Sequence, residues 1–172
     1  MRAKLAFLLS LAFVCLSCIK EKPTGADLKV GDIIPDFEVM MNDGSVVTGQ
    51  ELRQSVSCVV FFHTSCPDCQ QVLPHIQQLY DKFAPLGVRF ALISREDEDA
   101  VVSAYWNQHT FTMPYSAQST REVYELFAQT RVPRVYLCEK GGIISYIHTD
   151  DPVPGFDDLN SQLISVCDSG KE

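Results

Sequence analysis

The sequence predicts a single α/β domain in which a mixed central β-sheet is flanked by helices. Three consecutive segments indicate this fold. Residues 57–62 form an unbroken apolar run, as expected of a strand buried on both faces of a sheet. Apolar residues at helical spacing follow over 67–83, and 86–93 returns to strand character. Together these segments make one βαβ unit, and the length of 172 residues suits one compact domain.

An N-terminal β-hairpin extension is expected before this unit. Residues 37–41 read as a strand, Asn42-Asp43-Gly44-Ser45 supplies hairpin-turn chemistry, and 46–48 return as the second strand. Thr48, followed three positions later by Glu51, predicts a capping box at the start of a short helix.

Helices and strands alternate through the rest of the chain. A second long helix is expected over 97–109, and Ser119 with Glu122 predicts the cap of a third that runs to residue 129. Two strands, 132–138 and 143–148, form a hairpin across Gly141-Gly142, and a last helix covers 156–167. This order places helices on both faces of a mixed sheet.

The first residues have the layout of a secretory signal. Arg2 and Lys4 precede an apolar run over residues 5–16, which is far shorter than the roughly 20 residues that span a bilayer as a helix. We assign residues 1–17 to a signal peptide, 18–29 to a tether and 30–172 to the domain.

The end of this segment is similar to a bacterial lipoprotein signal. Ser17 precedes Cys18, which would receive the lipid and become the new N-terminus. Processing at Cys15 and an ordinary cleaved secretory signal are the alternatives. We therefore expect a protein of the bacterial cell envelope that faces the periplasm and is held at the membrane by its lipid alone.

Charge excludes one class of partner. The formal net charge is −8, and the loss of Arg2 and Lys4 with the signal would take it to −10. No basic run is long enough to neutralise a phosphate backbone, so we expect no nucleic-acid partner.

The candidate chemistry lies in Cys66-Pro67-Asp68-Cys69, where the buried strand gives way to the long helix. Free backbone N–H groups and the positive end of the helix dipole stabilise a thiolate there. Ser65 is the expected N-cap, and Pro67 suits the first helical turn. Cys66, nearer the helix end, is expected to attack, and Cys69, further into the helix, to resolve the mixed disulfide.

A static disulfide and half of a zinc site are the alternatives for this pair. A zinc site would need a second pair of ligands at short spacing. The four histidines are scattered instead, at His63, His75, His109 and His148. We therefore expect neither a metal nor another cofactor.

Residues 31–147 resemble the TlpA/ResA-like branch of the thioredoxin superfamily, the membrane-tethered thiol-disulfide oxidoreductases of the bacterial envelope. The matching stretches are Val30-Gly31-Asp32-Ile33-Ile34-Pro35-Asp36-Phe37, Asp43-Gly44, the motif from Cys66 to Cys69 with Pro74 five residues later, Val132-Pro133, and Gly141-Gly142-Ile143. The resemblance implies a thioredoxin-like fold and a reductant of disulfides in envelope proteins, itself reduced by an upstream membrane thiol donor.

The resemblance also implies roles for further residues. Pro133 matches the cis-proline that packs against the two cysteines, and Val132 before it would offer backbone groups to a substrate strand. Pro67 and Asp68, inside the motif, would lie on the same substrate surface. Pro74 is expected to kink the helix just past the motif.

This chain departs from the family pattern around the motif. His63-Thr64-Ser65 stands where relatives carry tryptophan, and Val60 and Val72 stand where they carry a buried carboxylate or a glutamate. The usual proton relay for Cys69 is therefore not expected.

Two neighbouring side chains have competing interpretations. Asp68 could favour the thiol form of Cys66 and so bias the pair toward donating electrons, or it is a solvated acid at a helix start. His63 could oppose that effect when protonated, or it makes one ordinary hydrogen bond.

The other cysteines of the domain, Cys58, Cys138 and Cys167, are expected to be buried inert thiols, with a Cys58–Cys138 disulfide as an alternative. Arg131 and Arg134 flank Pro133 and are expected to be exposed cations.

Two other functions compete with the oxidoreductase. A peroxiredoxin would need threonine three residues before its reactive cysteine and proline four before that, whereas His63 and Val59 occupy these positions relative to Cys66. A Cu(I)-binding chaperone would use the two thiolates with a distant histidine such as His148.

Overall fold

The computed structural model describes residues 26–169, so the expected signal peptide and most of the expected tether lie outside the described residues. The elements are, in chain order, β1 (Glu38–Met40), β2 (Val46–Thr48), α1 (Gly49–Leu52), β3 (Ser57–Phe62), α2 (Pro67–Phe83), a 3₁₀ turn (Ala84–Leu86), β4 (Arg89–Ser94), α3 (Asp99–His109), β5 (Tyr115–Ser116), α4 (Glu122–Glu125), β6 (Arg134–Cys138), β7 (Ile144–His148) and α5 (Phe156–Ser169). None of the described helices is long and apolar enough to cross a membrane.

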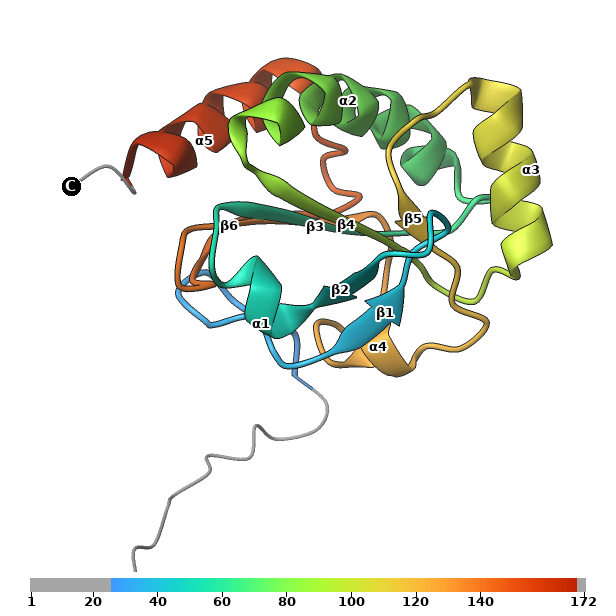
Figure 1. Cartoon of the computed structure of the whole chain (residues 1–172), viewed down its shortest axis with the longest axis horizontal. Coiled ribbons are helices and arrows are strands. Elements are labelled where there is room, and N and C mark those ends of the chain that lie inside the picture. The colour runs from blue at the N-terminus through green and yellow to red at the C-terminus, as the bar shows by residue number, and fades with distance from the viewer. Residues whose placement is uncertain (1–25, 170–172) are drawn as a thin grey trace, which may run out of the picture.

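The central sheet has five strands in the order β5-β4-β3-β6-β7 (Figure 1). Strand β3 pairs in parallel with β4 and antiparallel with β6, which makes the sheet mixed, as expected. All six residues of β3 are buried, because helices cover both faces of the sheet at its centre.

Helices pack on both faces of this sheet. Helices α2 and α5 lie side by side on one face, while α1, α4 and the β1–β2 hairpin lie on the other (Figure 1). Helix α2 buries an apolar stripe that includes Leu73, Ile76 and Leu79, and Pro74 stands inside it. The capping box of α1 is confirmed, since Thr48 Oγ1 accepts from the Glu51 amide at 3.1 Å and Glu51 Oε2 accepts from the Thr48 amide at 3.2 Å.

Two local predictions were wrong. The helix expected to run to residue 129 is only the single turn α4, and no side chain caps it. The Phe127 amide donates to the Tyr124 carbonyl three residues back, which tightens the turn after α4, and Phe127 and Ala128 are buried in the core. Strand β5 was missed, because two residues give no periodic pattern.

Residues assigned to the end of the tether contact the domain. Leu28 is buried, and its amide donates to the Phe127 carbonyl at 2.8 Å. Asp27 forms an ion pair with Arg134 of β6. Contacts with the domain therefore begin before residue 30.

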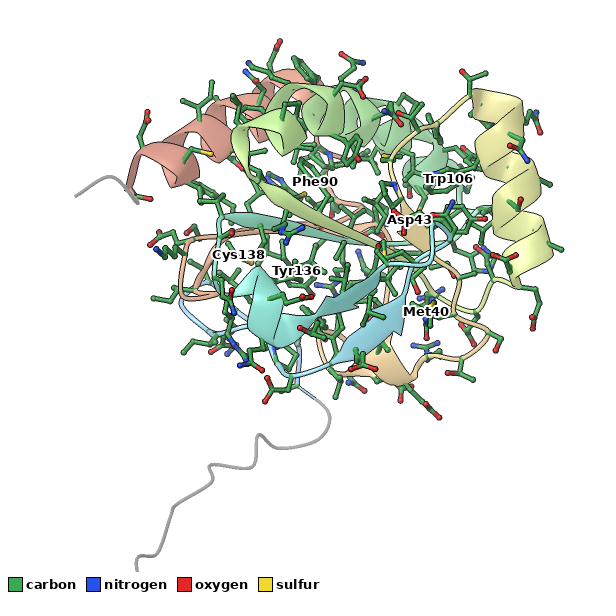
Figure 2. The ribbon with its side chains drawn as sticks, in the orientation of Figure 1. Met40, Asp43, Phe90, Trp106, Tyr136 and Cys138 are labelled. Carbon is green, nitrogen blue, oxygen red and sulfur yellow. The ribbon has the colours of Figure 1, made fainter. Side chains whose placement is uncertain are left out.

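The register of β3 and β6 shows whether Cys58 and Cys138 could form a disulfide. Ser57 lies opposite Cys138, and Cys58 lies opposite Leu137. Directly opposed residues of an antiparallel pair share a face, so Cys58 and Cys138 project from opposite faces of the sheet. Figure 2 shows Cys138 with Tyr136 on the side that carries α1 and the β1–β2 hairpin. Both cysteines are free, and a disulfide between them is ruled out.

Burial keeps these two thiols protonated. It raises the pKa of Cys138 to about 12, and it raises the pKa of Cys58 further above the ordinary range. Since the thiolate is the reactive form of cysteine, Cys58 and Cys138 are inert in the folded protein.

Candidate active site

The two motif cysteines lie where β3 ends and α2 begins. Cys66 is itself the N-cap of α2, with extended backbone dihedral angles and no side chain capping the helix. The expected cap at Ser65 is therefore wrong. The Cys66 amide donates back to the His63 carbonyl at 3.0 Å, and this turn delays the helix start by one residue. The cap position, where free backbone N–H groups point outward, thus carries the sulfur.

The structure gives the two thiols different surroundings. Cys66 is partly exposed, whereas Cys69 is completely buried one turn further along α2, and both are free. Burial raises the pKa of the Cys69 thiol far above its ordinary value, against smaller opposing effects of the His63 backbone and the Arg95 charge. Cys69 is therefore held in its protonated form behind Cys66.

The alkylation rate of Cys69 is expected to rise about tenfold for each unit of pH between about 7 and 10, because the thiolate fraction grows in that proportion below a raised pKa. The measurement is site-resolved mass spectrometry of a Cys66→Ser protein treated with iodoacetamide. A free cysteine-containing peptide in the same reaction is the reference, and its rate should level off above about pH 9 because its thiol has an ordinary pKa. A plateau in the Cys69 rate by about pH 9 would contradict this assignment.

The Val132–Pro133 peptide lies against the reactive turn. It is cis, as the resemblance implied for Pro133. The Cys66 thiol donates to the Val132 carbonyl, with 3.4 Å between Sγ and the oxygen. The side chains of Val132 and Pro133 are both buried, so the carbonyl is the part of Val132 that meets the sulfur. Pro67 is exposed and Asp68 half-buried on the adjacent first turn of α2.

A buried carboxylate that the sequence analysis missed braces the turn before Cys66. Asp97 is only 4% exposed, and its Oδ2 accepts from the Thr64 amide at 2.7 Å. Its Oδ1 accepts from the Thr64 hydroxyl at 3.2 Å and lies 3.4 Å from His63 Nδ1. His63 Nδ1 also contacts the Ser65 hydroxyl at 3.0 Å, so this histidine is tied into the turn.

One signal could have revealed Asp97. It follows β4, the parallel neighbour of β3, and the carboxyl ends of neighbouring parallel strands meet at one edge of a sheet. The family pattern has acidic residues at positions 60 and 72 instead, and in this chain both positions hold buried valines.

The two arginines around Pro133 differ from each other. Arg131 is exposed, as expected, and pairs with Asp150 at 3.3 Å. Arg134 is buried, which corrects the expectation of an exposed cation, and its Nη2 lies 2.6 Å from Asp27 Oδ2. Its burial follows from its place in β6, next to the central strand.

The histidine of the copper alternative is engaged elsewhere. His148 Nε2 lies 2.6 Å from Gln162 Oε1 of α5. Within residues 26–169, no three His, Cys, Asp or Glu side chains are grouped so that they could hold a metal ion. The geometry does not favour Cu(I) binding by Cys66, Cys69 and His148.

Comparison with known proteins gives a consistent result. The sequence profile of the AhpC/TSA family matches residues 30–147. The thiol-disulfide oxidoreductase ResA of Oceanobacillus iheyensis is 25% identical over 150 residues, which cover 85% of this chain and 78% of that protein.

Solved structures share the fold. A candidate protein disulfide isomerase from Bacteroides thetaiotaomicron superposes with a TM-score of 0.76 at 21% identity, over 87% of this chain and 94% of that one. A thiol:disulfide interchange protein of the thioredoxin family from Chlorobium tepidum gives 0.69 at 21% identity, over 83% and 99%. The fold is therefore thioredoxin-like.

Proposed function

We propose that this chain, which belongs to the AhpC/TSA family, is an envelope thiol-disulfide oxidoreductase that reduces disulfides in substrate proteins. The relatives named thiol-disulfide oxidoreductase support the reaction class. The observation that carries the proposal is the unequal pair at the start of α2, with Cys66 partly exposed and Cys69 buried behind it.

The first step uses the exposed sulfur. The Cys66 thiolate attacks one sulfur of a substrate disulfide, which forms a Cys66–substrate disulfide and releases the other substrate sulfur as a thiolate that takes up a proton. Cys66 must lose its proton to react, and it then no longer donates to the Val132 carbonyl. That carbonyl becomes available to a backbone N–H of the substrate, with Pro67 and Asp68 on the adjoining surface.

The second step uses the buried sulfur. Cys69 gives its proton to solvent or to the leaving thiolate and attacks Cys66, so that the substrate leaves as a dithiol and Cys66–Cys69 becomes a disulfide. Two electrons have then passed to the substrate, and an upstream membrane thiol donor must restore the dithiol.

Peroxidase activity is not favoured, although the family name covers such enzymes. His63 and Val59 stand where a peroxiredoxin needs threonine and proline. His63 is instead part of the turn braced by Asp97.

The location in the cell belongs to the same proposal. Residues 1–17 would direct export, Cys18 would carry the lipid, and the following residues would tether the domain at the periplasmic side of the envelope. Cys15 is the alternative lipid site.

The wild-type protein is expected to accelerate the reduction of insulin by dithiothreitol, seen as earlier precipitation of the insulin B chain. A Cys69→Ser protein should accumulate a mixed disulfide between Cys66 and its substrate, because the resolving sulfur is gone. Mass spectrometry of the adduct after non-reducing electrophoresis identifies both linked cysteines.

A Cys167→Ser protein is the matched control, since Cys167 lies in α5 and outside the motif. It should release its substrate as the wild type does. An adduct that forms equally well with Cys69 present, or a wild-type lag equal to that of dithiothreitol alone, would refute the oxidoreductase assignment.

A further inference from the structure

The segment before Pro133 is held by side chains from several elements rather than by strand pairing. Each carbonyl from residue 129 to residue 132 accepts a hydrogen bond from a different side chain. The donors are Arg121 Nη2 to Gln129 at 2.6 Å, Arg134 Nη2 to Thr130 at 2.8 Å, the Tyr124 hydroxyl to Arg131 at 2.6 Å, and the Cys66 thiol to Val132 at 3.4 Å. We call residues 129–132 the docking segment.

The backbone of the docking segment needs this support. Arg131 has a φ of 71°, in the left-handed region that residues other than glycine adopt only where their surroundings hold them. A segment fixed by side chains shifts when one of its contacts is lost, and Val132 at its end touches Cys66.

Asp27 completes the set of contacts from the N-terminal side. Its Oδ1 accepts from the Gln129 amide at 2.8 Å, and its Oδ2 lies 2.6 Å from Arg134 Nη2. One carboxylate thus binds the docking segment directly and also binds the guanidinium that holds Thr130. Arg134 is only 7% exposed, so the charge that offsets its buried cation comes from Asp27.

We infer that Asp27 is a positioning residue for the reaction, which acts through Arg134 and Gln129 to keep the Val132 carbonyl where a substrate backbone meets Cys66. This inference rests on the proposed function. Asp27 contacts neither sulfur, so it serves the docking of a polypeptide and not the exchange reaction itself. It also ties the docking segment to the part of the chain that leads to the N-terminus.

The positioning role predicts a split between substrates. An Asp27→Ala protein is expected to show a KM for insulin raised about tenfold with kcat little changed, because docking is lost while the cysteines stay in place. Its rate with the small disulfide 5,5′-dithiobis(2-nitrobenzoate), which needs no backbone docking, should stay within about twofold of the wild type. The full chain is used throughout, and circular dichroism verifies that it is folded.

Asp27→Asn is a milder substitution that removes only part of the contacts of Asp27. Its amide oxygen can still accept from the Gln129 amide, but the charge facing Arg134 is lost, so its KM should fall between those of the wild type and Asp27→Ala. It also serves if Asp27→Ala fails to fold. Asp36→Ala is the matched control, because Asp36 is likewise an N-terminal acid paired with an arginine, Arg53, but has no contact with the docking segment. It should leave the KM unchanged.

The outcomes separate this inference from the proposed function. A wild type that fails to reduce insulin refutes the proposed function. An active wild type with equal KM values for Asp27→Ala, Asp27→Asn and Asp36→Ala overturns the positioning role alone. The positioning role is also overturned if Asp27→Ala lowers the rates with insulin and with the small disulfide to the same extent, because the substitution would then impair Cys66 itself.

Discussion

Replacement of Cys66 by serine is expected to lower insulin reduction by at least about a thousandfold, to the rate of dithiothreitol alone. The hydroxyl of serine is not ionised at neutral pH and forms no disulfide, so the first bond of the cycle cannot form. Cys69 cannot substitute, because it is completely buried and burial raises its pKa far above the ordinary range. Turbidity of insulin and the rate of substrate thiol release both measure this loss.

The change is conservative for folding, which makes the result interpretable. The serine hydroxyl takes the place of the thiol at the helix cap, and the extended cap conformation suits serine well. The unfolding midpoint should therefore stay close to that of the wild type. Residual activity of a few per cent or more would mean that another sulfur attacks the substrate, and the assignment of Cys66 would be wrong.

Removal of the Asp97 carboxylate is expected to have the second large effect, a loss of about 3 kcal/mol in the free energy of unfolding. An Asp97→Ala protein leaves the Thr64 amide and hydroxyl, both buried, without their acceptor. The turn from His63 to Ser65 then loses its brace, and Cys66 at its end is less well placed. We expect a drop in insulin reduction of about tenfold as well. Urea unfolding followed by tryptophan fluorescence measures the stability.

Glu98→Ala is the control for Asp97→Ala. Glu98 is the next residue, is exposed, and makes no side-chain capping bond to α3. Its loss should change the free energy of unfolding by no more than about 0.5 kcal/mol. If the two variants were equally stable, Asp97 would not brace the turn.

The sequence predicted those parts of the fold whose pattern is local. The six-residue apolar run of β3 and the helical stripe of α2 are long and regular, and the capping box of α1 spans only four residues. The position of Cys66 and Cys69 between β3 and α2 followed directly from these elements. Such features need no knowledge of distant parts of the chain.

The parts that could not be predicted depend on contacts between distant residues. Asp97 reaches Thr64 across 33 positions, and Asp27 reaches Arg134 across 107. No local feature of the sequence predicts that Arg134 is buried while the nearby Arg131 is exposed. The helix expected up to residue 129 ends early for the same reason, because Phe127 packs into the core.

The placement of Cys58 and Cys138 protects their thiols from oxidation once the chain has folded. An unfolded chain exposes all its cysteines, and mispairing between them is fastest before folding is complete. Once β3 and β6 pair, the two core thiols are separated by the thickness of the sheet and closed off from small oxidants. Folding thus protects Cys58 and Cys138 themselves against misoxidation.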